Sequence, residues 1–155
     1  MLATILKRGL APACVLALIL FVVAFHYRAP YYDHWDLIPF YAATQSGDLA
    51  LQDLFALHGN HWHATGYLVQ LGLSDFTAMG HWAESLTSIL FAGFGFFALV
   101  RMVKHTASEF SASGATAWAI AISAFFFFSL AQAANWLWGW QVAVFINLAA
   151  MLWMI

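Results

Sequence analysis

The sequence predicts an all-α protein, a polytopic bundle of about four transmembrane helices with short amphipathic helices in a long first outer loop. Three observations lead to this prediction. The chain is 64% hydrophobic and only 8% charged, whereas soluble domains carry about 25% charged residues. It contains four apolar runs, each near the roughly 20 residues that a helix needs to cross a bilayer. Its basic residues are also unevenly distributed around those runs, as is typical of membrane proteins.

The first span is predicted over residues 1–27, where Lys7 and Arg8 precede an apolar run from Leu10 to Phe25. A secretory signal peptide has the same order of charge and apolar core, but it ends in a cleavage site of small residues. This run ends instead in AFHYRAPYY. We therefore expect a retained membrane anchor.

Residues 28–82 are predicted to form an outer loop that contains short helices. Apolar residues recur at helical spacing in three stretches of this loop. Ser46-Gly47-Asp48 separates the first two stretches, and Gly59-Asn60 separates the second from the third. Such helices would lie along the membrane surface with their apolar faces toward lipid or the bundle. A connection this long is usually functional.

The remaining spans are predicted in the second half of the chain. The second covers 83–104, a cytoplasmic loop covers 105–114, and the third and fourth spans lie within 115–155. The last apolar run continues to Ile155 without a flanking loop, and a helix that ends in hydrocarbon leaves carbonyl groups without partners. We therefore expect the N-terminal part of a longer polytopic protein. A complete four-span protein is the alternative.

Charge distribution predicts the orientation in the membrane. Lys7, Arg8, Arg101 and Lys104 flank the first two spans on one side, which the positive-inside rule assigns to the cytoplasm. Every acidic residue except Glu109 falls on the opposite side. We therefore expect a membrane protein with a cytoplasmic N-terminus and a first loop on the outer side.

Several classes of protein are excluded by composition and motif. A single cysteine, Cys14, cannot form a disulfide within the chain or a cysteine-based zinc site. There is no basic stripe of the kind that binds nucleic acid. The sequence also lacks a phosphate-binding glycine loop, a G-x-S-x-G nucleophile motif and a cofactor motif.

Two aspartates directly follow the first span and are the candidate catalytic residues. If Asp33 begins a helix, the spacing of three places Asp33 and Asp36 on adjacent faces. One carboxylate could cap the helix while the other acts as a general base or a metal ligand. Alternatively, both aspartates only cap the helix and keep its entrance soluble.

Three histidines near the middle of the loop form a second group. The spacing of His58 and His61 suits one face of a helix, although Gly59-Asn60 interrupts it. His61 and His63 would instead converge on one side of a strand. A complete site for a divalent metal would need a carboxylate from elsewhere in the loop: Asp33, Asp36 or Asp53. Hydrogen bonding to a phosphate and a purely interfacial role are the alternatives.

Further polar residues lie where the spans meet the outer surface. Arg28 is the only permanently charged cation on the acidic side, and a bound phosphate would need it. Asn135 and Gln141 border a tryptophan-rich turn that includes Trp138, and amides in such places usually join helices by hydrogen bonds. Three more residues are expected to be interfacial anchors: His26, His81 and Glu84.

Three segments, DHWDLIPFY, GDLALQDLFALHGNH and NWLWGWQ, resemble the opening part of bacterial membrane glycosyltransferases with the C-type (GT-C) architecture. In that family a first span leads into a long outer loop with helices parallel to the interface, and an acid early in the loop acts in catalysis. The chain departs from the family pattern at His34, Asn60 and Trp62, where the pattern has an acid, an acid and an arginine.

The resemblance implies transfer of a sugar from a polyprenyl-phosphate donor to an acceptor at the outer face. Asp33 or Asp36 would remove a proton from the acceptor hydroxyl. The implied substrate-binding residues are those that could neutralise the lipid phosphate or contact the donor: Arg28, Trp35, His58, His61, Asn135, Trp138 and Gln141. No cofactor is expected, with a divalent metal as the alternative. The competing class is a non-enzymatic membrane subunit or transporter fragment whose outer loop is an interfacial lid.

Overall fold

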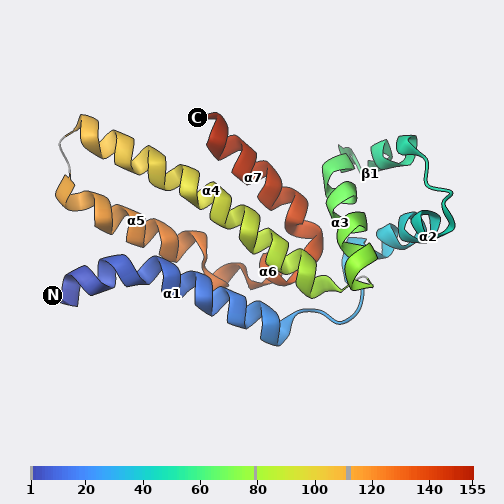
Figure 1. The fold of residues 1–155 in the computed structure, drawn as a ribbon, viewed down its shortest axis with the longest axis horizontal. Helices are drawn as coiled ribbons and strands as arrows, with labels where there is room; N and C mark the ends of the chain where they lie inside the picture. Colours follow the sequence, from blue (N-terminus) through green and yellow to red (C-terminus); the bar gives the residue numbers. More distant parts are fainter. Residues whose placement is uncertain (1, 79, 111–112) are drawn as a thin grey trace.

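The computed structural model describes residues 2–78, 80–110 and 113–155, and the side chains of residues 2–8 and 113 lie outside this description. The chain forms a helical bundle with a cap at one end (Figure 1). The bundle contains α1 (Leu2–Phe25), α4 (His81–Glu109), α5 (Ser113–Phe127) and α7 (Val142–Met154). The cap is formed by residues 32–77, which lie between α1 and α4 in the sequence.

Helix α4 is the central element of the bundle, because it packs against α1, α5 and α7. Its contact with α7 is the most extensive. There, a Cβ added to Gly95 would lie only 3.2 Å from the Cα of Ala149. Small residues at a helix crossing let the two backbones approach closely. The pair Gly95 and Ala149 therefore sets the short separation of α4 and α7.

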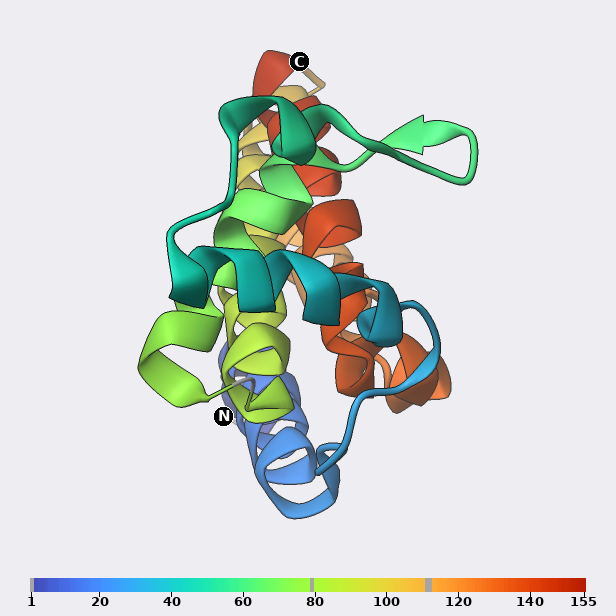
Figure 2. The ribbon, with the colours of Figure 1, turned by 90° about the vertical axis from the view of Figure 1, so that its right-hand side faces the viewer.

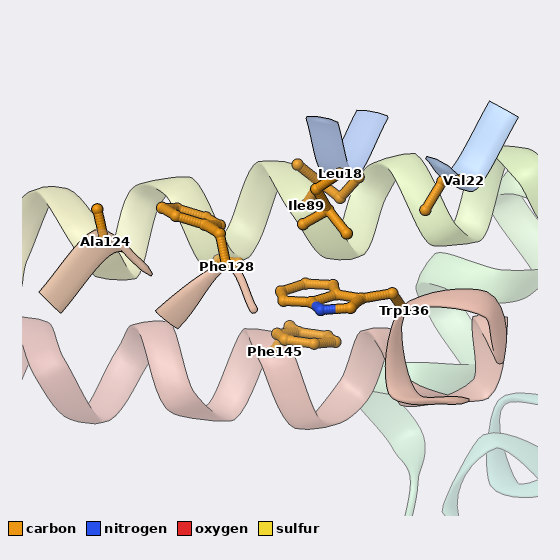
Figure 3. Close-up of a cluster of buried hydrophobic side chains, with 8 residues drawn as sticks. Leu18, Val22, Ile89, Ala124, Phe128, Trp136 and Phe145 are labelled. Atoms are coloured by element: carbon orange, nitrogen blue, oxygen red, sulfur yellow. The ribbon is translucent and has the colours of Figure 1, made fainter. Parts of the chain in front are cut away.

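Between α5 and α7 the chain forms short turns instead of one continuous helix. They are η3 (Leu130–Gln132), α6 (Ala133–Leu137) and η4 (Gly139–Gln141). Trp136 of α6 is fully buried and stacks on Phe145 of α7, with ring centroids 4.4 Å apart (Figure 3). Its indole N–H donates to the carbonyl of Ser129 over 3.0 Å. These contacts fix η4 beside the beginning of α4.

The cap is built from several short elements. They are η1 (Tyr32–Leu37), α2 (Ile38–Ser46), η2 (Leu51–Phe55), the strands β1 (Leu57–His58) and β2 (His61–Trp62), and α3 (Ala64–Thr77). The β1–β2 hairpin projects to one side when the molecule is viewed from this end (Figure 2). The cap has its own apolar core, separate from the one around Trp136 in the bundle. It consists of Leu37, Leu54, Tyr67, Leu71 and Trp140. Because Trp140 belongs to η4, this core also joins the cap to the bundle.

The predicted helical fold class is confirmed, with the short hairpin as the exception within the described ranges. Two helical segments are long and apolar enough to cross a membrane, His81–Glu109 and Gly114–Leu137. Two other apolar helices are shorter: Gly9–Phe25 and Gly139–Met154.

Helix α4 begins at His81, before the predicted start of the second span at residue 83. Helix α4 continues to Glu109, so much of the loop predicted at 105–114 is helical. Apolar composition marks only the hydrophobic part of a helix, and α4 extends beyond it into polar sequence. Residues 111 and 112 of that loop lie outside the described residues. The same holds for the side chains of Lys7 and Arg8, on which the predicted orientation depended.

Candidate functional site

The short helix η1 sorts its side chains onto different faces. It is a 3₁₀ helix, in which residues three apart lie above one another. Asp33 and Asp36 therefore share one face, whereas His34 and Leu37 share another and are buried. Trp35 lies between these faces and is 59% exposed. A single turn of chain thus presents two acids on one side and a buried histidine on another.

Asp33, Asp36 and His58 form what we call the outer cluster. The His58 ring reaches both acids: Nε2 lies 3.4 Å from Oδ2 of Asp33, and Nδ1 lies 3.5 Å from Oδ2 of Asp36. The side chain of His58 is 21% exposed, and those of Asp33 and Asp36 are 38% and 62% exposed. The cluster is therefore open to water.

The β-hairpin positions His58 for this contact. Gly59 has a φ of +57°, a left-handed conformation that glycine adopts without steric cost. Gly59-Asn60 forms the tight loop, and His58 pairs with His61 across the two strands. The sequence allowed either a helix or a strand around His58, and the structure has a strand there. His61 is exposed, and its ring lies 6.5 Å from that of His63.

Trp140 forms the floor of the outer cluster. It is 4% exposed, and its ring centroid lies 4.7 Å from that of His58 and 5.4 Å from that of His63. The ring of Tyr67 lies 6.0 Å away on the same indole. Aromatic surfaces with a few polar groups at their edge are typical of small-molecule sites. Trp140 therefore places an apolar surface beneath the acids and histidines.

Two titratable groups beside the outer cluster have displaced pKa values. Burial, together with the neighbouring His58 and His61, lowers the pKa of His63, while Asp33 acts in the opposite direction. Burial, followed by the charge of Asp36, raises the pKa of Tyr67. Both groups are therefore neutral at pH 7. A neutral His63 can accept a hydrogen bond from a bound molecule.

A groove of about 800 Å³ lies between the hairpin and the first half of α7. His63 lines this groove and its ring lies 5.4 Å from that of His58, so the groove adjoins the outer cluster. Its remaining lining is partly apolar and partly polar, including Leu57, Asn60, His61, Trp62, Val144 and Asn147.

A second group, which we call the inner cluster, consists of His34, His81 and Glu84. Nε2 of His34 lies 2.6 Å from Oε2 of Glu84, and Nδ1 of His81 lies 3.7 Å from the same oxygen. The three residues are only 1%, 3% and 3% exposed. Glu84 packs so closely against Gly139 that a Cβ there would overlap its carboxylate. His81 and Glu84 were expected to be interfacial anchors, and the structure corrects this because η1 and η4 cover them.

Neither aspartate of the outer cluster acts as the cap of η1. The N-cap residue is Tyr31, and no side chain caps it. The capping aspartate of the loop is instead Asp53, whose Oδ2 accepts the backbone N–H of Ala50 over 2.8 Å at the start of η2. The alternative in which Asp33 and Asp36 only cap the helix therefore does not hold for η1.

Within the described ranges, the other predicted substrate-binding residues form no hydrogen bond or ion pair with Asp33, Asp36 or His58. Arg28 and Asn135 are exposed, and Gln141 is half-buried. Trp138 is half-buried against the rings of Tyr31 and Tyr32. Its indole nitrogen has no hydrogen-bond partner within the described part of the chain.

Sequence reasoning missed the inner cluster. One signal was present, because His81 and Glu84 are three residues apart at the start of an apolar helix, a spacing that places them on one face. The third member, His34, is 50 residues from Glu84 in the sequence. No local spacing could have joined it to the other two.

The fold and the two clusters define a helical protein with two candidate membrane-spanning segments and a cap that carries acid–histidine groups. Comparison with protein-family models, with curated proteins and with solved structures gives no match for this chain. Its function must therefore be inferred from the geometry of the cap.

Proposed function

We propose that this chain belongs to a GT-C-type membrane glycosyltransferase, which transfers a sugar from a polyprenyl-phosphate donor to an acceptor at the outer face of a bacterial inner membrane. The observation that carries the proposal is the convergence of Asp33, Asp36 and His58 at one end of the bundle. The two acids come from η1 and the histidine from the hairpin, so separate parts of the loop build one open acid–histidine site.

A location in the membrane is supported by the apolar surface of the bundle. Only 28% and 17% of the most apolar windows of the two candidate spans are buried, and soluble monomers rarely expose large apolar patches. Exposed apolar side chains occur on all four bundle helices, among them Leu20, Phe94, Phe97, Phe126 and Val144. We propose that α1, α4, the segment α5–α6 and α7 are the four spans. The cap then faces the outer side.

In the proposed reaction Asp33 is the general base. It is the less exposed of the two acids, and its carboxylate would accept the proton of the acceptor hydroxyl as the hydroxyl attacks the sugar. Asp36 would hold the His58 ring in place, and His58 and Arg28 would face the departing phosphate. The lipid tail of the donor stays in the bilayer, so the reacting carbon must lie at the interface. The groove beside His63 offers space for the acceptor.

The test is an assay of transfer in membranes from the native cell, with substitutions made in the chromosomal gene. Labelled polyprenyl-phosphate sugar is the donor. Asp33→Asn is expected to lower the rate of transfer by about 10²–10⁴-fold, the usual contribution of a general base. The matched control is Asp48→Asn, an exposed acid of the same loop, which should transfer at the normal rate.

Full transfer by the Asp33→Asn, Asp36→Asn double variant would contradict the proposal. If these substitutions lowered the melting temperature while transfer continued, the outer cluster would be part of a non-enzymatic lid.

A further inference from the structure

We propose that the inner cluster is a binding site for a divalent transition-metal ion, with Zn²⁺ as the best fit, held by His34, His81 and Glu84. This inference is independent of glycosyl transfer, because the residues belong to neither the outer cluster nor the groove. It concerns an ion that joins η1 to the first turn of α4.

The donor set selects the class of ion. Two imidazole nitrogens and one carboxylate are ligands that Zn²⁺ and other late transition metals prefer. Mg²⁺ and Ca²⁺ prefer sites made of oxygen atoms. Two histidines and one glutamate also form a well-known zinc set, in which a water molecule completes the coordination.

The geometry is close to what a zinc ion needs. One ligand atom from each residue lies within 4.8 Å of the others. Tetrahedral zinc with bonds of about 2.0–2.1 Å would place its ligand atoms about 3.3 Å apart. The two observed separations from the Glu84 oxygen, 2.6 Å to His34 and 3.7 Å to His81, lie on either side of this value. Small side-chain rotations would therefore bring the three ligand atoms to the separations that zinc requires.

Unpartnered nitrogen atoms provide a second and independent observation. Both ring nitrogens of His81, and Nδ1 of His34, are buried without a hydrogen-bond partner within the described ranges. Buried polar groups are nearly always satisfied in folded proteins, and one that remains unpaired requires an explanation. A metal ion bonded to one ring nitrogen of His81 would give that nitrogen a partner.

The surroundings keep the glutamate directed at the two histidines. Gly139 leaves no Cβ where the Glu84 side chain lies. The ring of His34 meets that of His81 edge to face, with centroids 4.1 Å apart and planes at 78°. The Trp140 ring lies 6.0 Å from that of His34 and separates the inner cluster from the outer one. A bound ion and its one water ligand would thus be shielded from bulk solvent by η1 and η4.

Cobalt binding to the purified full chain in detergent tests this proposal. After treatment with a chelator, Co²⁺ is titrated and the visible absorption of four-coordinate cobalt is recorded. The expected result is one Co²⁺ per chain, a rise in melting temperature on binding, and loss of the visible bands when Zn²⁺ is added. A chain that binds no Co²⁺ or Zn²⁺ in stoichiometric amount would overturn the proposal.

Cysteine substitution identifies the ligands without requiring a loss of folding. In His81→Cys a thiolate would replace one imidazole, so Co²⁺ should give a new sulfur-to-cobalt charge-transfer band in the near ultraviolet. The matched variant is His58→Cys in the outer cluster, which should bind Co²⁺ without this band. If the band appears in His58→Cys and not in His81→Cys, while both variants keep wild-type helicity, the metal belongs to the outer cluster and the proposal is wrong.

Discussion

The inner and outer clusters begin in the same turn of chain and end in opposite environments. Asp33 and Asp36 face His58 at a surface open to water, whereas His34, which lies between them in the sequence, is 1% exposed beside Glu84. The 3₁₀ geometry of η1 causes this separation, because its period of three divides neighbouring residues among different faces.

This difference determines what each cluster can contribute. Exposed ion pairs add little to stability, typically about 0–1 kcal/mol, so the outer cluster is free to serve a bound molecule. In the buried cluster every polar atom requires a partner, and removing one member leaves the others without compensation. We therefore expect substitutions in the inner cluster to affect folding, and substitutions in the outer cluster to affect activity.

Removal of Glu84 should give the largest change in stability. Glu84→Ala would leave two buried histidines without their shared carboxylate, and breaking a buried pair costs about 3–5 kcal/mol of unfolding free energy. Unfolding in detergent with a chelator present measures this change. Asp36→Ala in the outer cluster is the control, with an expected change within about 0.5 kcal/mol. Equal changes in the two variants would remove the distinction between the clusters.

Gly139→Ala should sharpen the comparison, because it acts on Glu84 without altering a charged residue. The added Cβ would lie 2.7 Å from the Cβ of Glu84, and overpacking of this kind costs about 1–3 kcal/mol. Gly72→Ala is the matched control, since nothing lies within 4 Å of a Cβ there. It lies within α3 and should stabilise the chain by up to about 1 kcal/mol. Similar melting temperatures for the two variants would contradict the packing of Glu84 on Gly139.

The smallest expected effect on stability comes from the protonation of His63. Its pKa is lowered by burial and by His58 and His61, so the unfolded chain binds a proton before the folded chain does. The contribution of His63 to stability is therefore complete above pH 6.5 and decreases as the pH falls below that value. Histidine NMR titration should give a midpoint below 6.5, and His61→Ala should raise it. A midpoint above 6.5 would contradict the described surroundings of the ring.

The sequence predicted the helical class because apolar runs of bilayer length are a strong local signal. It also singled out Asp33, Asp36 and His58, since acids and histidines are unusual in so apolar a chain. The local fold around His58 could not be decided, because Gly59-Asn60 permits either a broken helix or a hairpin. The inner cluster could not be predicted either, because its formation depends on the packing of η1 and η4 over α4.

The most direct test of this account measures whether the two faces of η1 differ in access from outside the cell. Single cysteines are introduced as Asp36→Cys or His34→Cys after replacing the natural thiol by Cys14→Ala, and intact cells are treated with a maleimide that cannot cross membranes. We predict that Asp36→Cys is labelled, whereas His34→Cys is labelled only after denaturation. Equal labelling of both cysteines, or labelling of Asp36→Cys only in permeabilised cells, would contradict the account.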